Sequence, residues 1–172
     1  MSKILISPYA ARLFDGRESP KRYPYWPKLV DLLNKEGYEV VQVGVKGEDR
    51  IDGVSQFVID FPFHKLKELL DECVLYIAVD NVFQHFAHYE RLKRGIVLWG
   101  PSDYKIFGHP ENINMSRGME FLRPNQFQTW TEWEWNPAAF PYAENVLHEV
   151  VKLTPPALTA RTSIGSYATT RT

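Results

Sequence analysis

Runs of consecutive apolar residues alternate along this chain with longer stretches in which apolar residues recur every three or four positions. Short apolar runs bounded by turn residues are typical of strands buried on both faces, and the longer stretches are typical of amphipathic helices. The pattern predicts strands over residues 3–7, 38–45, 56–59, 74–79 and 95–99. It predicts helices over residues 26–36, 62–72, 81–93 and 142–153.

This alternation predicts an α/β fold. We expect a single Rossmann-like domain over residues 1–153, with a mostly parallel sheet of about five to six strands and helices on both faces. Beyond Ser102 the pattern weakens, although residues 129–135 (TWTEWEW) alternate as an amphipathic strand or extended segment would. Residues 154–172 contain few apolar side chains, so we expect them to form a flexible or loosely packed tail.

The chain has 172 residues, the usual size of one domain, and a formal net charge of −1. A nearly neutral chain has no bulk attraction to nucleic acid, so we expect no nucleic-acid partner. No apolar stretch approaches the ~20 residues of a membrane span, and the N-terminal apolar run, ended by Pro8, is too short for a signal peptide. We therefore expect a cytoplasmic protein. The one cysteine, Cys73, excludes an internal disulfide, and we expect it to be buried.

The residues that follow the predicted strands are nearly all small or polar. In open parallel sheets, ligands bind beyond the carboxyl ends of the strands, where the strand order reverses. The residues at these positions are Ser7 and Pro8, residues 44–46, Asp60, Asp80 and Asn81, and residues 100–103. Such side chains suit a crevice for phosphate groups or sugar hydroxyls, so we expect a ligand site at this edge.

Asp80, Asn81 and His85 form the strongest candidate cluster. The carboxylate of Asp80 can accept hydrogen bonds from sugar hydroxyls, and the following helix N-terminus offers free N–H groups that favour phosphate. His85 lies about one turn further along the same helix. The same spacing is equally well explained if Asp80 or Asn81 only caps the helix and His85 is an ordinary helix residue.

Charged side chains follow the first two strands. Arg12 and Lys21 could hold a diphosphate, although charged loop residues are usually just solvated. Lys46 and Glu48 could meet a nucleoside, with Glu48 accepting hydrogen bonds from ribose hydroxyls.

Aromatic and histidine residues complete the candidates. Trp130, Trp133 and Trp135 could stack on a base, although a strip of tryptophans more often belongs to a core or an interface. No two His or Cys residues have metal-ligand spacing and the histidines are dispersed along the chain, so we expect no metal site and no cofactor.

Four motifs together resemble the C-terminal domain of family 9 glycosyltransferases, the group that contains the lipopolysaccharide heptosyltransferases. They are the Trp26-Pro27 pair that opens the first helix, the VVQVG strand at residues 40–44, the acidic motif of Asp80, Asn81 and His85, and the turn Gly100-Pro101-Ser102-Asp103. The resemblance spans about residues 3–114, and the joint order of the motifs is more specific than any one of them. The turn by itself is explained equally well by the turn-forming chemistry of its residues.

The resemblance implies one half of a GT-B fold and an inverting, metal-independent transfer from an ADP- or UDP-linked sugar. It implies that Asp80 and Asn81 lie near the donor sugar and diphosphate, that His85 supports them, and that Ser102 and Asp103 line the same pocket. With Asp80 and His85 as the catalytic candidates, the remaining donor-binding candidates are Ser7, Arg12, Lys21, Lys46, Glu48, Asn81, Gly100, Pro101, Ser102 and Asp103.

Two departures from the family pattern bear on this expectation. Val82 stands where the acidic motif has glycine, and a bulky residue there can narrow a phosphate site. GT-B enzymes also have a second, acceptor-binding domain, so a partner subunit or another copy would have to supply it. Three hypotheses follow: a glycosyltransferase or a subunit of one, a nucleotide or nucleotide-sugar binding module without transferase activity, or a structural interaction protein on the same fold.

Overall fold

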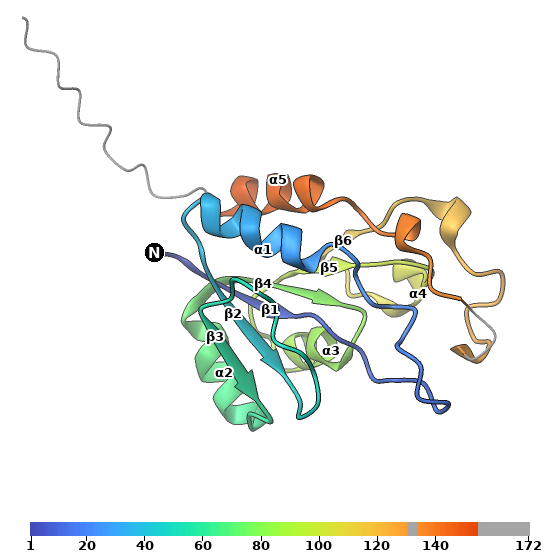
Figure 1. The fold of residues 1–172 in the computed structure, drawn as a ribbon, viewed down its shortest axis with the longest axis horizontal. Helices are drawn as coiled ribbons and strands as arrows, with labels where there is room; N and C mark the ends of the chain where they lie inside the picture. The colour runs from blue at the N-terminus through green and yellow to red at the C-terminus, as the bar shows by residue number, and fades with distance from the viewer. Residues whose placement is uncertain (131–133, 155–172) are drawn as a thin grey trace, which may run out of the picture.

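A computed structural model describes residues 1–130 and 134–154 of the chain. Six strands form one sheet in which every pair of neighbours is parallel, and the strand order is β3-β2-β1-β4-β5-β6 (Figure 1). The strands are β1 (Lys3–Ser7), β2 (Glu39–Gly44), β3 (Gln56–Ile59), β4 (Cys73–Val79), β5 (Ile96–Leu98) and β6 (Ile113–Met115). From β1 the chain adds β2 and then β3 on one side of the sheet. It then returns and places β4 on the other side of β1. The strand order therefore reverses between β1 and β4.

Helices cover both faces of the sheet, as the alternating pattern predicted. Helices α1 (Trp26–Lys35) and α5 (Ala143–Leu153) lie together on one face, and α2 (Phe63–Asp71) and α3 (Val82–Tyr89) lie on the other (Figure 1). The remaining helical turns are α4 (Tyr104–Phe107), η1 (Met119–Phe121) and η3 (Pro137–Ala139). The fold is a single Rossmann-like α/β domain.

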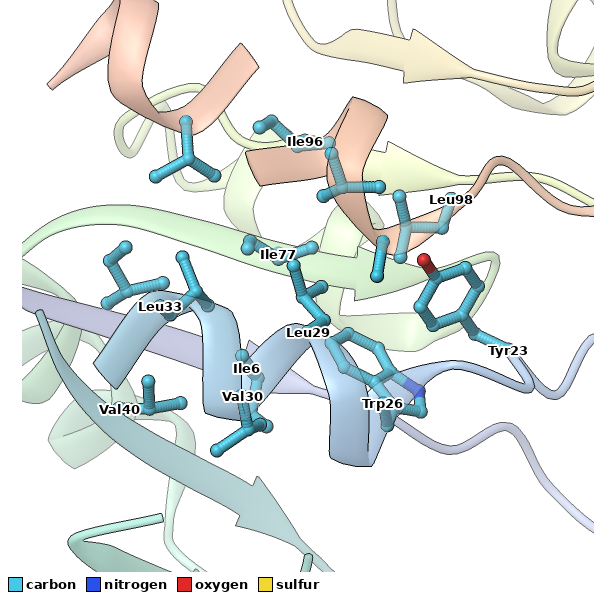
Figure 2. Close-up of a cluster of buried hydrophobic side chains, with 14 of the residues drawn as sticks. Ile6, Tyr23, Trp26, Leu29, Val30, Leu33, Val40, Ile77, Ile96 and Leu98 are labelled. Carbon is cyan, nitrogen blue, oxygen red and sulfur yellow. The ribbon is translucent and has the colours of Figure 1, made fainter. Parts of the chain in front are cut away.

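Two hydrophobic clusters, one on each face of the sheet, form the core. Because successive strand residues point to opposite faces, Ile4 and Ile6 of β1 enter the cluster under α1 and α5, while Leu5 enters the cluster over α2 and α3. Figure 2 shows Leu29 and Leu33 of α1 against Ile77 of β4, and all three are fully buried. Each such side chain contributes about 1.5–3 kcal/mol on burial. Alternate residues of the same strands therefore pack against the helices on both faces of the sheet.

Helix α3 ends at Tyr89, earlier than the predicted end at residue 93. Arg91 adopts a left-handed backbone conformation with φ 53°, which interrupts the helix. The N–H of Leu92 donates to the carbonyl of Ala87, and that of Arg91 donates to the carbonyl of His88. This pair of bonds is the Schellman motif, in which glycine usually takes the left-handed position. Because arginine stands there instead, the end of the helix could not be predicted from the sequence.

The sequence pattern missed two short elements, the strand β6 and the helical turn α4. β6 has only three residues, all half-buried, and α4 has only four. Segments this short carry too few residues to express a period. Both lie in the region beyond Ser102 where the pattern weakens.

The range 129–135 was expected to form an amphipathic strand or an extended segment. Its described residues belong to no strand, and residues 131–133 lie outside the described part of the chain. Trp130 and Trp135 do not share a strand face. The Arg123 guanidinium lies 3.6 Å from the Trp130 ring centroid, and the Arg22 guanidinium lies 4.9 Å from that of Trp135. Each tryptophan thus packs on its own arginine, and these contacts outweigh the alternation of apolar and polar residues that had indicated a strand. The predicted tail at 154–172 falls, apart from Thr154, outside the described residues as well.

Two further expectations concern burial and hydropathy. Cys73 is 1% exposed, as expected, and burial raises the pKa of its thiol to about 11, against the opposing effect of Lys93 and Lys3. None of the helices in the described ranges combines the length and hydrophobicity that crossing a bilayer would require.

Candidate functional site

A cleft of about 830 Å³ opens beyond the carboxyl ends of β1, β2 and β4, at the point where the strand order reverses. Its volume lies within the range of about 300–1,000 Å³ that is common for small-molecule sites. The cleft gathers seven of the twelve catalytic and donor-binding candidates, namely Ser7, Arg12, Lys21, Glu48, Asp80, Asn81 and His85. The topology therefore brings together side chains that lie between the end of β1 and the first turns of α3 in the sequence.

Asp80 follows directly after β4 and is only 5% exposed. Its Oδ2 lies 2.6 Å from Nζ of Lys21, and its Oδ1 accepts a hydrogen bond of 3.0 Å from Nε2 of the fully buried Gln84. Both carboxylate oxygens are thus engaged within the protein. A buried carboxylate persists only with such partners, so this pair joins the long β1–α1 loop to the end of β4.

Asn81, rather than Asp80, caps helix α3. Its Oδ1 accepts from the N–H of Phe83 at 2.9 Å. Its Nδ2 donates toward the carbonyl of Tyr9 at 2.8 Å, and toward the carbonyl and Oγ of Ser7 at 3.1 and 3.0 Å. The one side chain therefore fixes the start of α3 and the end of β1 relative to each other. The capping interpretation is correct for Asn81, and it coexists with a place in the cleft wall.

Val82, the departure from the family glycine, is the first residue of α3 and needs no positive φ. Its side chain is 66% exposed and lines the cleft. Phe14, Val45 and Phe63 are also exposed and line the same cleft, so its mouth is largely apolar. The valine consequently changes the surface that a ligand would meet without straining the backbone.

Glu48 folds back over the end of β2. Its Oε2 accepts a 2.9 Å hydrogen bond from the N–H of Val45, and a Cβ on Gly44 would lie 2.3 Å from that same oxygen. Glycine at position 44 is therefore what leaves room for the carboxylate. Burial raises the pKa of Glu48, the Val45 N–H opposes this, and the nearby Asp60 adds to the rise.

Lys46 does not accompany Glu48 into the main cleft. Its side chain is exposed, and its backbone N–H donates to Oδ1 of Asp60 at 3.1 Å. It lines a neighbouring depression of about 540 Å³, which Glu48 and Arg12 also border. The two loop residues expected to act together therefore share the smaller depression, and only Glu48 also lines the main cleft.

The cations near the cleft are paired with carboxylates. Arg12 lies 2.6 Å from Glu18 and is largely exposed, whereas Lys21 is paired with the buried Asp80. An anion entering the cleft would have to compete with these carboxylates. Lys21 is therefore more than a solvated loop charge, because it pairs with a buried carboxylate, whereas Arg12 is close to being one.

Gly100, Pro101, Ser102 and Asp103 do not line the cleft. The carbonyl of Pro101 accepts from Nε2 of Gln126 at 3.2 Å, and the N–H of Asp103 donates to Oε1 of Gln126 at 2.9 Å. Asp103 also caps α4, through the N–H of Lys105. These bonds account for the motif as turn chemistry that holds the segment after β6.

Gly100 and Ser102 of this turn are both buried. A Cβ on Gly100 would lie 2.4 Å from the ring of Phe140, so glycine is required for close packing there. Ser102 is 2% exposed, and its Oγ makes no hydrogen bond within the described residues.

Arg123 supports Trp130 of the cleft lining, a role that the sequence did not reveal. It is 5% exposed, its guanidinium lies on the ring of Trp130, and it donates to the carbonyl of Gln128 at 2.7 Å. Trp130 in turn lines the cleft, with Nζ of Lys21 5.5 Å from its ring centroid. Burial lowers the pKa of Arg123 and the charge of Asp80 opposes this, but a guanidinium stays protonated. No local pattern singles out one arginine in an irregular segment.

His85 lines the cleft, as expected, and its Nδ1 lies 2.9 Å from Nε2 of His109. The histidines are dispersed along the sequence, but the fold brings His85, His88 and His109 together. Ligand atoms of His88, His109 and Glu111 lie within 4.8 Å of one another. Because His109 is distant in sequence from α3, only the fold reveals this grouping.

Comparisons with protein-family models, with curated proteins and with solved structures gave no match to this chain.

Proposed function

We propose that this chain binds a nucleotide-diphosphate sugar in the cleft at the strand-order reversal, as a glycosyltransferase or a glycosyltransferase subunit. The observation that carries the proposal is the gathering of Lys21, Asp80, Asn81 and His85 at that cleft, next to the ring of Trp130. Open α/β sheets bind ligands at this position. The motif resemblance supports the choice of a sugar nucleotide over other ligands of the same size.

Each part of the donor has a chemical counterpart in the cleft. Glu48 stands just past β2, where an acidic residue of many nucleotide-binding α/β domains accepts hydrogen bonds from ribose hydroxyls. Trp130 offers a flat aromatic surface for a base, already flanked by Arg123. Lys21 provides the positive charge for a diphosphate. Its ammonium group leaves Asp80 when a phosphate oxygen takes the place of the carboxylate. Asp80 then becomes available to a sugar hydroxyl or to a reacting group.

A non-catalytic binding module is the second candidate. Both oxygens of Asp80 are engaged, by Lys21 and by Gln84. A carboxylate held in this way is suited to positioning Lys21 rather than to taking a proton from an acceptor. A transferase additionally requires a site for the acceptor.

The test is calorimetric titration of the purified protein with ADP, UDP, GDP and their sugar conjugates. We expect micromolar binding of one nucleotide-sugar, weakened at least tenfold by Asp80→Asn and by Glu48→Gln. Asp31→Asn, on the exposed side of α1, is the matched control and should bind as the unchanged protein does. Circular dichroism would establish that each variant is folded.

The outcomes separate the hypotheses. Donor turnover in the presence of an acceptor extract or a partner subunit would support the transferase. Binding without turnover would favour the binding module. If none of the nucleotides or conjugates binds, the donor-binding proposal is wrong, and an interaction role on this fold becomes the better hypothesis.

A further inference from the structure

A cluster of three imidazoles and one carboxylate lies beside α3, outside the machinery described above except for His85. Helix α3 supplies His85 and His88, which are three residues apart and therefore share one helix face. The segment between α4 and β6 supplies His109 and Glu111. Side chains from two separate segments thus converge on one point.

The contacts within this cluster are close. The rings of His88 and His109 are stacked, with centroids 3.7 Å apart and planes inclined by 8°. His88 Nδ1 also pairs with Oε1 of Glu111, and His85 Nδ1 lies 2.9 Å from His109 Nε2. Histidine binds metals in its neutral form, through the ring nitrogen that carries no hydrogen.

The segment that carries His109 and Glu111 is fixed from behind. Oδ1 of the buried Asn112 accepts from the hydroxyl of Tyr76 at 2.8 Å and from the N–H of Gly95 at 2.9 Å. Nδ2 of Asn114 donates to the carbonyl of His109 at 3.0 Å. These bonds attach the segment to β4, β5 and β6, so the two side chains are presented by a rigid support.

We propose that His88, His109 and Glu111 bind a divalent transition-metal ion of the zinc class, and that His85 positions the ring of His109. Histidine nitrogens with one carboxylate oxygen are typical zinc ligands. Ligand atoms of a tetrahedral zinc site lie about 3.4 Å apart, and those of the three groups already lie within 4.8 Å of one another. Because the rings of His88 and His109 are stacked nearly parallel, one of the two rings must turn for a nitrogen of each to face the same ion.

His85 has the geometry of an outer partner. A metal-bound histidine usually donates its other ring N–H to a neighbouring acceptor, which fixes the tautomer of the ring. With Nε2 of His109 directed at Nδ1 of His85, Nδ1 of His109 is the nitrogen that a metal would take. Since His85 also lines the cleft, metal binding would restrain one wall of the proposed nucleotide site.

The test is calorimetric titration of the chelator-treated full chain with zinc chloride and, separately, with magnesium chloride. We expect one equivalent of Zn²⁺ to bind with micromolar or tighter affinity and Mg²⁺ to bind at least a hundredfold more weakly, because Mg²⁺ prefers oxygen ligands. His88→Ala, His109→Ala and Glu111→Gln should each weaken zinc binding at least tenfold. His85→Ala should also weaken it, by a smaller factor.

His64→Ala and His148→Ala are the matched controls, because both histidines are exposed and lie outside the cluster. Zinc should raise the melting temperature of the unchanged protein and of both controls, but not that of Glu111→Gln, whose side-chain volume is conserved. Equal zinc affinity in the unchanged protein and the three ligand variants would overturn the proposal. So would an equal loss on replacing His64 or His148.

Discussion

At the residue scale, the most informative side chains are buried polar groups whose partners come from distant parts of the chain. Asp80 and Lys21 form such a pair, with 7% and 25% of their side chains exposed. The sequence indicated Asp80 as a strand-end carboxylate and Lys21 as a loop cation. It could not indicate that each would be the main partner of the other, because the loop between β1 and α1 has no periodicity from which to infer its path.

Replacing Lys21 by methionine should destabilise the protein by about 2–3 kcal/mol. The substitution leaves the buried carboxylate of Asp80 without its direct counter-charge, which costs more than losing an exposed pair, although the nearby Arg123 compensates in part. Urea denaturation measures the change. Lys35→Met, which removes the exposed pair with Asp31, is the control and should cost no more than about 0.5 kcal/mol. Equal losses in the two variants would argue against a structural role for the buried pair.

At the element scale, strands and helices followed from hydrophobic periodicity, whereas their ends depended on specific backbone contacts. Helix α1 begins at Trp26, where Pro27 occupies the first turn, and the prediction there is confirmed. Helix α3 begins at Val82 after the Asn81 cap, close to the prediction, but ends earlier than predicted. An arginine in the left-handed position is not a stop signal that can be read from sequence.

Replacing Arg91 by glycine should stabilise the protein by about 0.5–1 kcal/mol. The positive φ of 53° is strained for arginine and relaxed for glycine, and this gain exceeds the extra freedom that glycine gives the unfolded chain. Thermal unfolding measures the shift. Arg94→Gly, at an exposed position without a positive φ, should be neutral or slightly destabilising. A loss of stability in Arg91→Gly would mean that the arginine side chain makes contacts worth more than the strain.

At the scale of the whole molecule, one sheet unites two hydrophobic clusters that do not touch the same helices. Trp26 belongs to the cluster under α1 and α5, and Trp99 belongs to the cluster over α2 and α3. Every long strand contributes to both clusters, since neighbouring residues point to opposite faces. Loss of either cluster therefore removes the support of the other, and we expect cooperative unfolding.

Leu33→Ala and Leu70→Ala, each at a fully buried position in a different cluster, should each destabilise the protein by about 3 kcal/mol. Tryptophan fluorescence and far-UV circular dichroism should report one coincident transition in both variants. Lys67→Ala, on the exposed side of α2, is a control that should leave the midpoint nearly unchanged. Two separated transitions would show that the faces of the sheet unfold independently.

Most of the fold could be predicted from the sequence because short apolar runs and helical periods are local properties of the chain. The candidate site could be predicted in part. Asp80, Asn81 and Ser7 follow strands, and the general rule for parallel sheets places them at one edge. The turn at residues 100–103 also follows a strand, but contacts with Gln126 and Phe140 hold it outside the cleft lining.

The sequence by itself determined the alternation of elements, since apolar runs and helical periods depend on residues close together in the chain. That alternation in turn indicated a mostly parallel sheet. Only the tertiary structure decided the strand order β3-β2-β1-β4-β5-β6 and the partners of the buried polar groups. It alone joined Lys21 to Asp80 and brought His109 and Glu111 to α3. The physical reason is that the path of irregular loops is set by long-range hydrogen bonds, ion pairs and packing, which leave no period in the sequence.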